Sequence, residues 1–328
     1  MTGETHKLQR LDEFRSEIVV RENEALSKHT RFGLGGPARW MVDVRSSSVL
    51  PKVVAILRES GLPVITLGGG SNLIVADAGF DGVVLRFTGS SISTNDGLTV
   101  AETGAVWQEV VDFHSDLGLT GMERMTGIPG WLGGALYGNA GAYGQTIMDF
   151  VEQVTVFDGV VLRDVANVDC GFAYRTSGFK AHKDWILLAA RMRLAPGDAD
   201  AVRNTAAEIL ATRNEKFPPT LKCAGSIFKN LFVAQLPTKA LSRVPAGVIR
   251  AGKVPSAWFL EEIGSKGMHE GGIEVANYHA NLIYNNGSGT AAEVCRLIDR
   301  LKSAVVEEFD LELEEEVQYV GFSDRVSR

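Results

Sequence analysis

Glycine is concentrated in a few short stretches of this chain, and this clustering constrains the fold more than any other feature. The chain has 36 glycines among 328 residues, about 11%, against a typical content of ~7%. Because glycine lacks a Cβ atom, clustered glycines let the backbone take positive φ angles or approach another group closely. The clusters lie at residues 33–38, 68–72 and 127–144, so these stretches are the first candidates for a binding surface.

Length and composition describe a globular protein with more than one domain. At ~150 residues per domain the chain predicts two or three domains, and its 45% hydrophobic and 22% charged residues are typical of a folded enzyme. The formal net charge of −7 disfavours nucleic acid and membranes as partners. The three widely spaced cysteines provide neither a disulfide framework nor a metal site. The polar first segment and the lack of a run of ~18 apolar residues make a cytoplasmic location the expectation.

Strands and helices are predicted to alternate along the chain. A helix that ends at Gly61 follows Ser46–Ser48, which are good N-cap residues. The last helix begins at Thr290, where Thr-Ala-Ala-Glu forms a capping box. Strands are predicted at residues 40–44, 62–67, 151–157, 186–193 and 311–317, the last with Glu312, Glu314 and Glu316 on one face.

The first glycine cluster does not predict a nucleotide site. Gly33-x-Gly35-x-x-Ala38 fits the dinucleotide pattern G-x-G-x-x-G/A. However, the residues before it form no buried strand, and no acidic residue follows at the expected distance. The Rossmann interpretation is therefore disfavoured.

The second and third clusters favour a cofactor surface when they are taken together. Residues 68–72, Gly-Gly-Gly-Ser-Asn, follow a predicted strand, and successive glycine amides can surround a phosphate. Residues 127–144 add a long stretch of backbone almost free of side chains, on which an extended cofactor could lie. Two such surfaces suit a dinucleotide better than a single phosphate. The alternative for both clusters is a set of tight turns.

Seven motifs extend a resemblance over nearly the whole chain, from about residue 23 to 321. In order they are HTRFGLGGPARW, LGGGSNLIVADAGFDG, GIPGWLGGALYGNAGAYG, AYRTSGFK, AGSIFKN, EEIGSKGMHEGGIEVANYHANLIYN and LELEEEV. The ordered set closely resembles the UDP-N-acetylenolpyruvoylglucosamine reductase (MurB) family of peptidoglycan precursor synthesis. The short interval between the fourth and fifth motifs is similar to the family's second type, which lacks an extra substrate-covering loop.

The resemblance implies an α+β fold. Its FAD-binding part would be of the PCMH or vanillyl-alcohol-oxidase-like kind, with subdomains at residues 1–85 and 86–198. An α/β domain for the UDP-sugar substrate would occupy residues 199–328. FAD would be bound non-covalently, and the implied cofactor residues are Gly68, Gly69, Gly70, Ser71, Asn72, Gly127, Ile128, Pro129, Gly133, Gly134, Asn139, Gly141, Ala142 and Tyr143.

The same resemblance implies a UDP-N-acetylmuramate dehydrogenase. NADPH would reduce FAD, and flavin N5 would then give hydride to C3 of UDP-N-acetylglucosamine enolpyruvate. Arg175 would stabilise the anion that forms, because a guanidinium matches a planar carboxylate. Ser226 would protonate C2, and Glu316 would donate a hydrogen bond in its protonated form. Taken singly, each could instead be a surface ion pair, a turn residue or a solvated acid.

The resemblance assigns the substrate's diphosphate and uracil to one asparagine and three lysines. These are Asn230, Lys266, Lys216 and Lys229, and a solvated lysine is the alternative for each of the three. His279 is expected to be structural. Two other functions stay open at this point: an oxidase or dehydrogenase of the same flavoprotein superfamily, and a flavin-free protein that binds nucleotide sugars.

Overall fold

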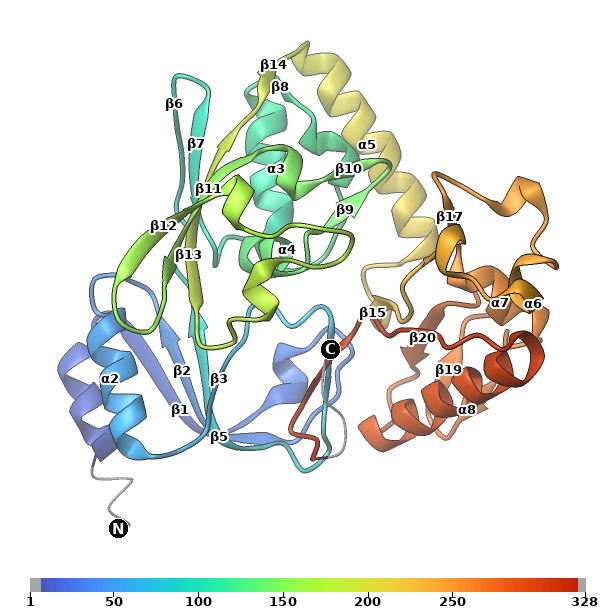
Figure 1. Ribbon diagram of the computed structural model, residues 1–328. Coiled ribbons are helices and arrows are strands. Elements are labelled where there is room, and N and C mark those ends of the chain that lie inside the picture. The colour runs from blue at the N-terminus through green and yellow to red at the C-terminus, as the bar shows by residue number, and fades with distance from the viewer. Residues whose placement is uncertain (1–6, 324–328) are drawn as a thin grey trace. The chain divides into compact units, whose positions relative to one another are not determined.

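The computed structural model describes residues 7–323, and the chain divides into two compact units (Figure 1). Unit 1 comprises Met1–Glu24, Ala38–Gly69 and Phe80–Glu215, and unit 2 comprises Ala25–Pro37, Gly70–Gly79 and Lys216–Arg328. Each unit is therefore assembled from segments far apart in the sequence, and the loop 68–72 is divided between them. The division at residues 85 and 198 stays a prediction, although the helix after residue 198 groups with unit 1 as far as Glu215.

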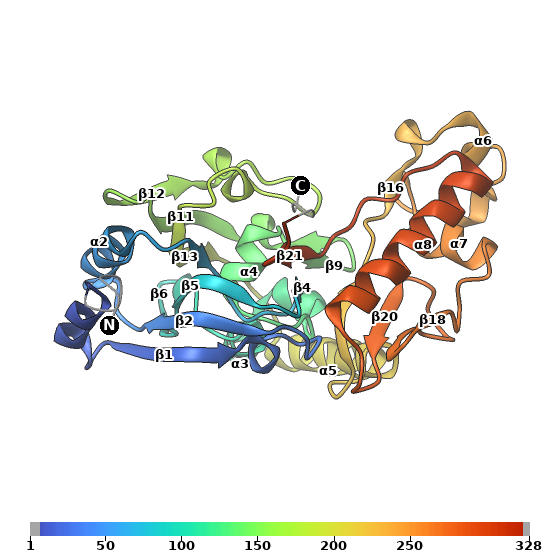
Figure 2. The same cartoon turned by 90° about the horizontal axis from the view of Figure 1, so that it is seen from below.

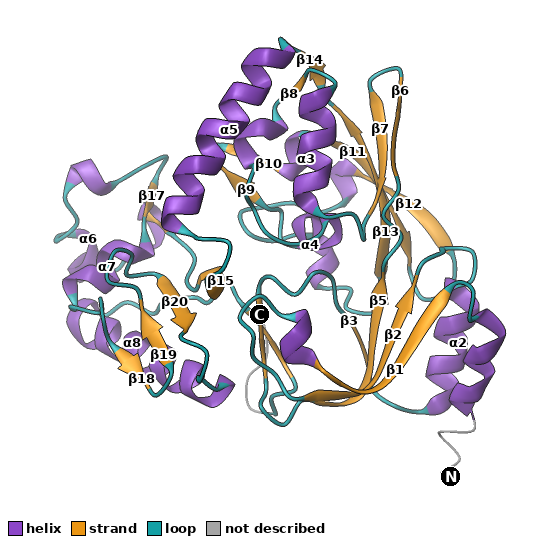
Figure 3. Cartoon of the chain, turned by 180° about the vertical axis from the view of Figure 1, so that it is seen from behind, coloured by secondary structure: helices purple, strands orange, loops and turns teal. Residues whose placement is uncertain are grey.

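The first sheet of unit 1 is built around parallel strands. Its order is β1 (Ile18–Ala25), β2 (Pro37–Val44), β5 (Phe80–Phe87) and β3 (Val64–Thr66), with β2 and β3 both parallel to β5. Helix α2 (Leu50–Ser60) covers one face of this sheet (Figure 3), and its Val53 and Leu57 are buried against Val83 and Leu85.

One end of helix α2 was predicted correctly and the other was not. Gly61 ends the helix at a φ of 78°, as expected for a left-handed C-cap. The predicted serine cap is wrong, because the N-cap residue is Val49 and no side chain caps the helix. The hydroxyls of Ser46 and Ser48 instead hydrogen-bond each other at 2.7 Å, before the helix begins.

The second sheet of unit 1 is antiparallel. Its order is β12 (Leu162–Ala166), β11 (Val151–Phe157), β13 (Ile186–Arg193), β7 (Leu98–Glu102) and β6 (Ile92–Asn95), and β11 and β13 coincide with the predicted strands. Alternate residues of β13 are buried, as the period of a strand requires. The helices of this part are α3 (Trp107–Asp116), α4 (Leu132–Tyr137) and α5 (Ala199–Lys216).

Unit 2 contains a four-stranded antiparallel sheet and a long amphipathic helix. The strand order is β15 (Lys222–Ser226), β20 (Leu282–Asn285), β19 (Ile273–Val275) and β18 (His269–Glu270). Helix α8 (Ala291–Phe309) packs on this sheet (Figure 2), and the predicted capping box at Thr290 and Glu293 is confirmed. The shorter helices are α6 (Thr238–Leu241) and α7 (Ser256–Glu262).

The predicted strand at 311–317 is wrong in its extent. Leu311, Leu313 and Val317 are buried, as the alternation of apolar residues requires. Within residues 311–317, however, β-pairing is limited to a single bridge between Glu315 and Phe228. Regular pairing begins later, in β21 (Gln318–Val320), which runs parallel to β4 (Leu73–Val75). The remaining short strands are β8 (Leu119–Thr120), β9 (Gly141–Ala142), β10 (Gln145–Thr146), β14 (Ala195–Pro196), β16 (Leu231–Phe232) and β17 (Lys253–Val254). Among residues 7–323, none of the helices combines the length and the apolar character that crossing a membrane requires.

Candidate active site

Two glycine backbones of unit 1 face space that protein atoms leave open. A Cβ atom added to Gly68 would lie 3.8 Å from the amide nitrogen of Gly134, which is its nearest contact. A Cβ added to Gly134 would meet no atom within 4 Å. The structure thus brings the loop after β3 and the first turn of α4 together, with an uncovered surface at their junction. We call this pair and its neighbours, residues 68–69 and 127–144, the glycine cradle.

Other glycines of the cradle are needed by the protein itself. A Cβ on Gly69 would lie 2.8 Å from Cδ1 of Trp131, and one on Gly133 would lie 3.1 Å from Cβ of Thr103. A Cβ on Gly141 would overlap the carbonyl oxygen of Gln145. Tight packing therefore explains these three glycines, but it does not explain Gly68 and Gly134. A bare backbone surface that no side chain fills fits an extended, phosphate-bearing group such as FAD.

The far side of the cradle supports the turn that carries Arg175. Asn139, predicted to bind cofactor, is buried and donates from Nδ2 to the carbonyl of Ala173 at 2.9 Å. Ser177 donates to the carbonyl of Tyr137 at 2.8 Å, and burial raises the pKa of Tyr137. Asn139 therefore positions the Arg175 turn, a role that its motif did not indicate. The structure places the other predicted cofactor residues of this stretch on either side of α4: Gly127, Ile128 and Pro129 in the loop before it, and Ala142 and Tyr143 in the short strand β9 and the turn after it.

Arg175 itself has a backbone conformation that side chains rarely adopt. Its φ is 56°, and the flanking residues Ala173 and Thr176 close a tight turn through two mutual hydrogen bonds. Lys180 donates from Nζ to the carbonyl of Arg175 at 2.9 Å and holds this conformation. Strained backbone of this kind is found most often at functional positions.

In unit 2 the structure brings Ser226 and Glu316 onto neighbouring backbone segments. The amide of Glu316 donates to the carbonyl of Ile227 at 2.7 Å, one residue after Ser226. The carbonyl of Glu316 accepts a hydrogen bond of 2.9 Å from the side chain of Asn72. Ser226 follows Gly225, whose φ is 75°, at an irregularity in the pairing of β15 with β20. Arg175 belongs to unit 1, so each unit carries part of the predicted catalytic set.

The first glycine cluster proves to be a packing surface for the second half of the loop 68–79. A Cβ on Gly35 would lie 2.7 Å from Cβ of Val75, and one on Gly36 would overlap the carbonyl of Asp77. Gly70 has a φ of 66°, and a Cβ there would overlap the carbonyl of His29. These close approaches explain the glycines at 33–36 without a ligand.

The four predicted substrate residues all lie in unit 2, and each contacts other groups of the protein. Lys229 pairs with Glu314, and Lys266 pairs with Glu261 at 2.9 Å. Oδ1 of Asn230 accepts from the amide of Ser256 at 3.3 Å. The fourth residue is Lys216, whose Nζ lies 5.7 Å from the centroid of the Phe217 ring.

His279 lies in the same neighbourhood as two of these lysines. Burial, with a further contribution from the charge of Lys216, lowers its pKa to about 4, and Lys266 and Glu261 also act on it. Its Nδ1 accepts from the amide of Asn281 at 3.1 Å, which agrees with a structural role. Within residues 7–323, no cluster of three His, Cys, Asp or Glu side chains is arranged to hold a metal ion.

Comparison with known proteins finds a family match for each of two parts of the chain. Residues 38–160 match the FAD binding domain family, and residues 217–320 match the C-terminal domain of UDP-N-acetylenolpyruvoylglucosamine reductase. The chain is 52% identical to that reductase from Solibacter usitatus over 304 residues, which cover 93% of this chain and 97% of the relative. It is 35% identical to the reductase from Rubrobacter xylanophilus over 302 residues, 91% of this chain and 94% of the relative.

A solved structure agrees with the sequence relatives. The crystal structure of MurB from Thermus caldophilus superposes with a TM-score of 0.71 at 28% identity, covering 92% of this chain and 98% of that one. These findings confirm the resemblance and the α+β fold with an FAD-binding part. The chain belongs to the UDP-N-acetylenolpyruvoylglucosamine reductase (MurB) family.

Proposed function

We propose that this chain catalyses the NADPH-dependent, FAD-mediated reduction of UDP-N-acetylglucosamine enolpyruvate to UDP-N-acetylmuramate. The reaction belongs to peptidoglycan precursor biosynthesis and would take place in the cytoplasm. The observation that carries the proposal is the hydrogen bond from the amide of Glu316 to the carbonyl of Ile227, which holds Glu316 beside Ser226 in a chain of this family. In this assignment residues 1–85 and 86–198 form the FAD-binding part, and residues 199–328 bind the UDP sugar.

The glycine cradle is the part of unit 1 that fits FAD. Gly68 and Gly134 would contact the cofactor through bare backbone, because any Cβ there would enter the open space between them. Gly127, Gly133 and Gly141 would shape the surrounding loops. When bound, FAD supplies the two-electron redox chemistry of the reaction.

Arg175 would bind the carboxylate of the enolpyruvyl group, where negative charge grows during reduction. A guanidinium forms two parallel hydrogen bonds with a carboxylate. The Arg175 turn is fixed in advance by Lys180 and Asn139, so little reorganisation is needed as the charge develops. A preorganised donor of this type commonly contributes ~3–4 kcal/mol to the transition state.

Ser226 would give its hydroxyl proton to C2 of the substrate. A serine hydroxyl is a weak acid, but a carbanion-like carbon is a strong enough base to accept its proton when the two are positioned. Glu316, in its protonated form, would donate a hydrogen bond to the same substrate carboxylate. Its backbone is fixed at both ends of the residue, by the bonds to Ile227 and Asn72, so its side chain starts from a defined position.

The diphosphate of the substrate would be bound by lysines that now pair with glutamates. Lys266 and Lys229 would exchange Glu261 and Glu314 for phosphate oxygens. Lys216 would add a third positive charge, and the Asn230 side chain would contact the uracil or ribose. Exchange costs little for the exposed pair of Lys266 with Glu261, because such pairs contribute only ~0–1 kcal/mol.

Product analysis tests the proposal. The FAD-loaded protein is mixed with NADPH and UDP-N-acetylglucosamine enolpyruvate, and the sugar nucleotide is examined by mass spectrometry. The proposal expects conversion to a species heavier by two hydrogens, with one NADPH consumed for each product. Consumption of NADPH that depends on oxygen, with the enolpyruvate unchanged, would instead support an oxidase of the same superfamily.

A further inference from the structure

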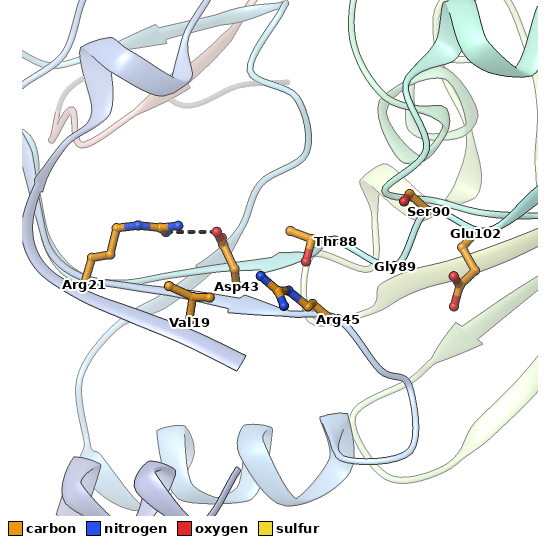
Figure 4. Close-up of a pocket in the computed structure, with 8 residues that line it drawn as sticks. All are labelled: Val19, Arg21, Asp43, Arg45, Thr88, Gly89, Ser90 and Glu102. Carbon is orange, nitrogen blue, oxygen red and sulfur yellow. Dashed lines mark hydrogen bonds and ion pairs between the residues drawn. The ribbon is translucent and has the colours of Figure 1, made fainter. Parts of the chain in front are cut away.

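A polar hollow of about 450 Å³ lies in unit 1 and shares no lining residue with the glycine cradle (Figure 4). One wall comes from the strands β1 and β2, with Arg21, Asp43 and Arg45. The other wall comes from the turn at residues 88–90, after β5, and from Glu102 at the end of β7. This volume is in the range of sites for small molecules. Nothing in the proposed reductase reaction uses these residues.

The hollow collects hydrogen-bond donors that the chain leaves unused. In the part of the chain that the structure describes, the Arg45 guanidinium forms no hydrogen bond or ion pair. Over the same residues, the backbone amides of Gly89 and Ser90 donate to no protein atom. Successive amides beside a guanidinium are a common means of binding an anion.

The fold keeps this turn close to Arg45. The amide of Thr88 donates to the carbonyl of Val44 at 2.7 Å, which ties the turn to the end of β2. A Cβ on Gly89 would lie 2.8 Å from the carbonyl oxygen of Arg45 and 2.8 Å from Oε1 of Glu102. Only glycine fits this position, so the amides of the turn stay beside the arginine.

The two acids of the hollow already have donors of their own. Asp43 is buried and accepts from Arg86 at 2.7 and 2.8 Å and from Arg21 at 2.9 Å. Oε2 of Glu102 accepts from both the amide and the hydroxyl of Ser91, at 2.9 and 2.8 Å. The lining thus carries two arginines and two carboxylates, and Asp43 is occupied by Arg86 and Arg21, which leaves Arg45 as the lining guanidinium available to a ligand.

We propose that this hollow binds the phosphate group of a small phosphate monoester. The Arg45 guanidinium and the amides of Gly89 and Ser90 are its ligands, with the hydroxyl of Ser90 beside them. Phosphate fits better than a carboxylate, because its tetrahedral oxygens accept from donors that come from both walls at once. The volume exceeds that of phosphate alone, so the organic part of the ligand occupies the rest.

Isothermal titration of the FAD-loaded protein tests this site, with glycerol 3-phosphate as the probe and excess UDP-N-acetylmuramate present to fill the nucleotide-sugar site. We expect one saturable site whose affinity falls ~10-fold or more in Arg45→Gln, the loss of a charge-assisted hydrogen bond. Arg250→Gln is the matched control, because Arg250 is also exposed but belongs to unit 2, whereas the residues that line the hollow belong to unit 1. Arg45→Lys keeps the positive charge but loses the paired N–H donors of the guanidinium, so its affinity for glycerol 3-phosphate should be intermediate.

A second readout reports on the residue itself. Phenylglyoxal modifies accessible arginines, and glycerol 3-phosphate should slow the modification of Arg45 saturably while leaving that of Arg250 unchanged. Inorganic phosphate should protect more weakly if the organic part contributes. Equal affinity of Arg45→Gln and the parent protein, equal protection by acetate, or no protection of Arg45 at all would overturn the proposal. Far-ultraviolet circular dichroism of each variant separates loss of the site from loss of the fold.

Discussion

The side-chain amide of Asn72 donates a hydrogen bond of 2.9 Å to the main-chain carbonyl of Glu316, 244 residues further along the chain. The two segments are joined a second time where the amide of Gln318 donates to the carbonyl of Asn72 at 3.0 Å. The amide of Glu316 in turn donates to Ile227. The end of the glycine loop therefore holds Glu316, and Glu316 is held beside Ser226. Asn72 thus supports the segment that carries the proposed catalytic pair, Ser226 and Glu316.

Replacement of Asn72 tests this support. Asn72→Ala removes one hydrogen bond and should lower the free energy of unfolding by about 1 kcal/mol. It should also slow the reoxidation of reduced flavin by the enolpyruvate more than the reduction of flavin by NADPH, because the role proposed for Glu316 concerns only the enolpyruvate. Asn72→Asp keeps the size of the side chain, but its carboxylate cannot donate a hydrogen bond to Glu316, so both effects should match those of Asn72→Ala. Stopped-flow measurement of the two half-reactions decides; equal slowing of both would show that Asn72 acts on the cofactor alone.

Gly134→Ala separates the cofactor surface from the fold. Because a Cβ there meets no protein atom and Gly134 lies in α4, the apoprotein should be unchanged or more stable by up to ~1 kcal/mol, the helix preference of alanine. The added methyl enters the cradle, so the affinity for FAD should fall ~10-fold or more. Gly69→Ala is the contrast, since its Cβ would crowd Trp131 and should destabilise the apoprotein. Unchanged FAD affinity in Gly134→Ala would argue against the cradle as the cofactor surface.

Ser226→Ala tests proton donation to C2. Reduction of flavin by NADPH should proceed as in the parent protein, whereas reoxidation by the enolpyruvate should slow by ~10²–10⁴-fold, the usual contribution of a general acid. Ser288→Ala is a suitable control, because Ser288 is exposed and hydrogen-bonds only within its own turn, to Asn286. If Ser226→Ala reoxidised with the enolpyruvate at the parent rate, another group would have to be the proton donor.

His279 should make stability fall as the pH falls. Its pKa is lowered to about 4 in the fold, from an ordinary value of 6.5. Between these two values the unfolded chain binds a proton that the folded chain does not, so protonation favours unfolding. From pH 7 to pH 4.5 the parent protein should lose about 2 kcal/mol more stability than His279→Gln. Urea unfolding at the two pH values measures this difference, and parallel curves for the two proteins would contradict it.

Asp77 should stabilise the first turn of α8. Its two carboxylate oxygens accept from the amides of Ala291 and Ala292 at 2.8 and 3.0 Å, in addition to the capping box at Thr290. Asp77→Ala should lower the free energy of unfolding by about 1–2 kcal/mol, the usual value of an N-terminal cap. Asp77→Asn keeps one acceptor and should cost less. Chemical denaturation compares the three proteins, and equal stability would mean that water replaces the carboxylate without cost.

Local patterns were sufficient to predict much of the fold. The capping box at Thr290 and the strands 151–157 and 186–193 are confirmed because they depend on neighbouring residues and on burial at a regular period. The strand at 311–317 was wrong in extent because alternation sets which side chains are buried, whereas pairing depends on where a partner strand lies. The serine cap of α2 failed because the serine hydroxyls bond each other and the helix begins after Val49, without a side-chain cap.

The sequence motifs supplied the candidate site residues but not the contacts that support them. Motifs of the family carry Arg175, Ser226 and Glu316, whose roles stay predictions. The bonds from Asn72 to Glu316 and from Asn139 to Ala173 join segments 244 and 34 residues apart. No pattern within a motif contains such a contact. The packing role of Gly35 against Val75 was hidden in the same way.

The most direct test of the central claim is an anaerobic absorbance titration of the FAD-loaded protein near 450 nm. NADPH is added first, and UDP-N-acetylglucosamine enolpyruvate is added after the spectrum is stable. NADPH should bleach the flavin band, and one equivalent of the enolpyruvate should restore it fully in the absence of oxygen. A band that stays bleached with the enolpyruvate and returns only on admission of air would contradict the assignment.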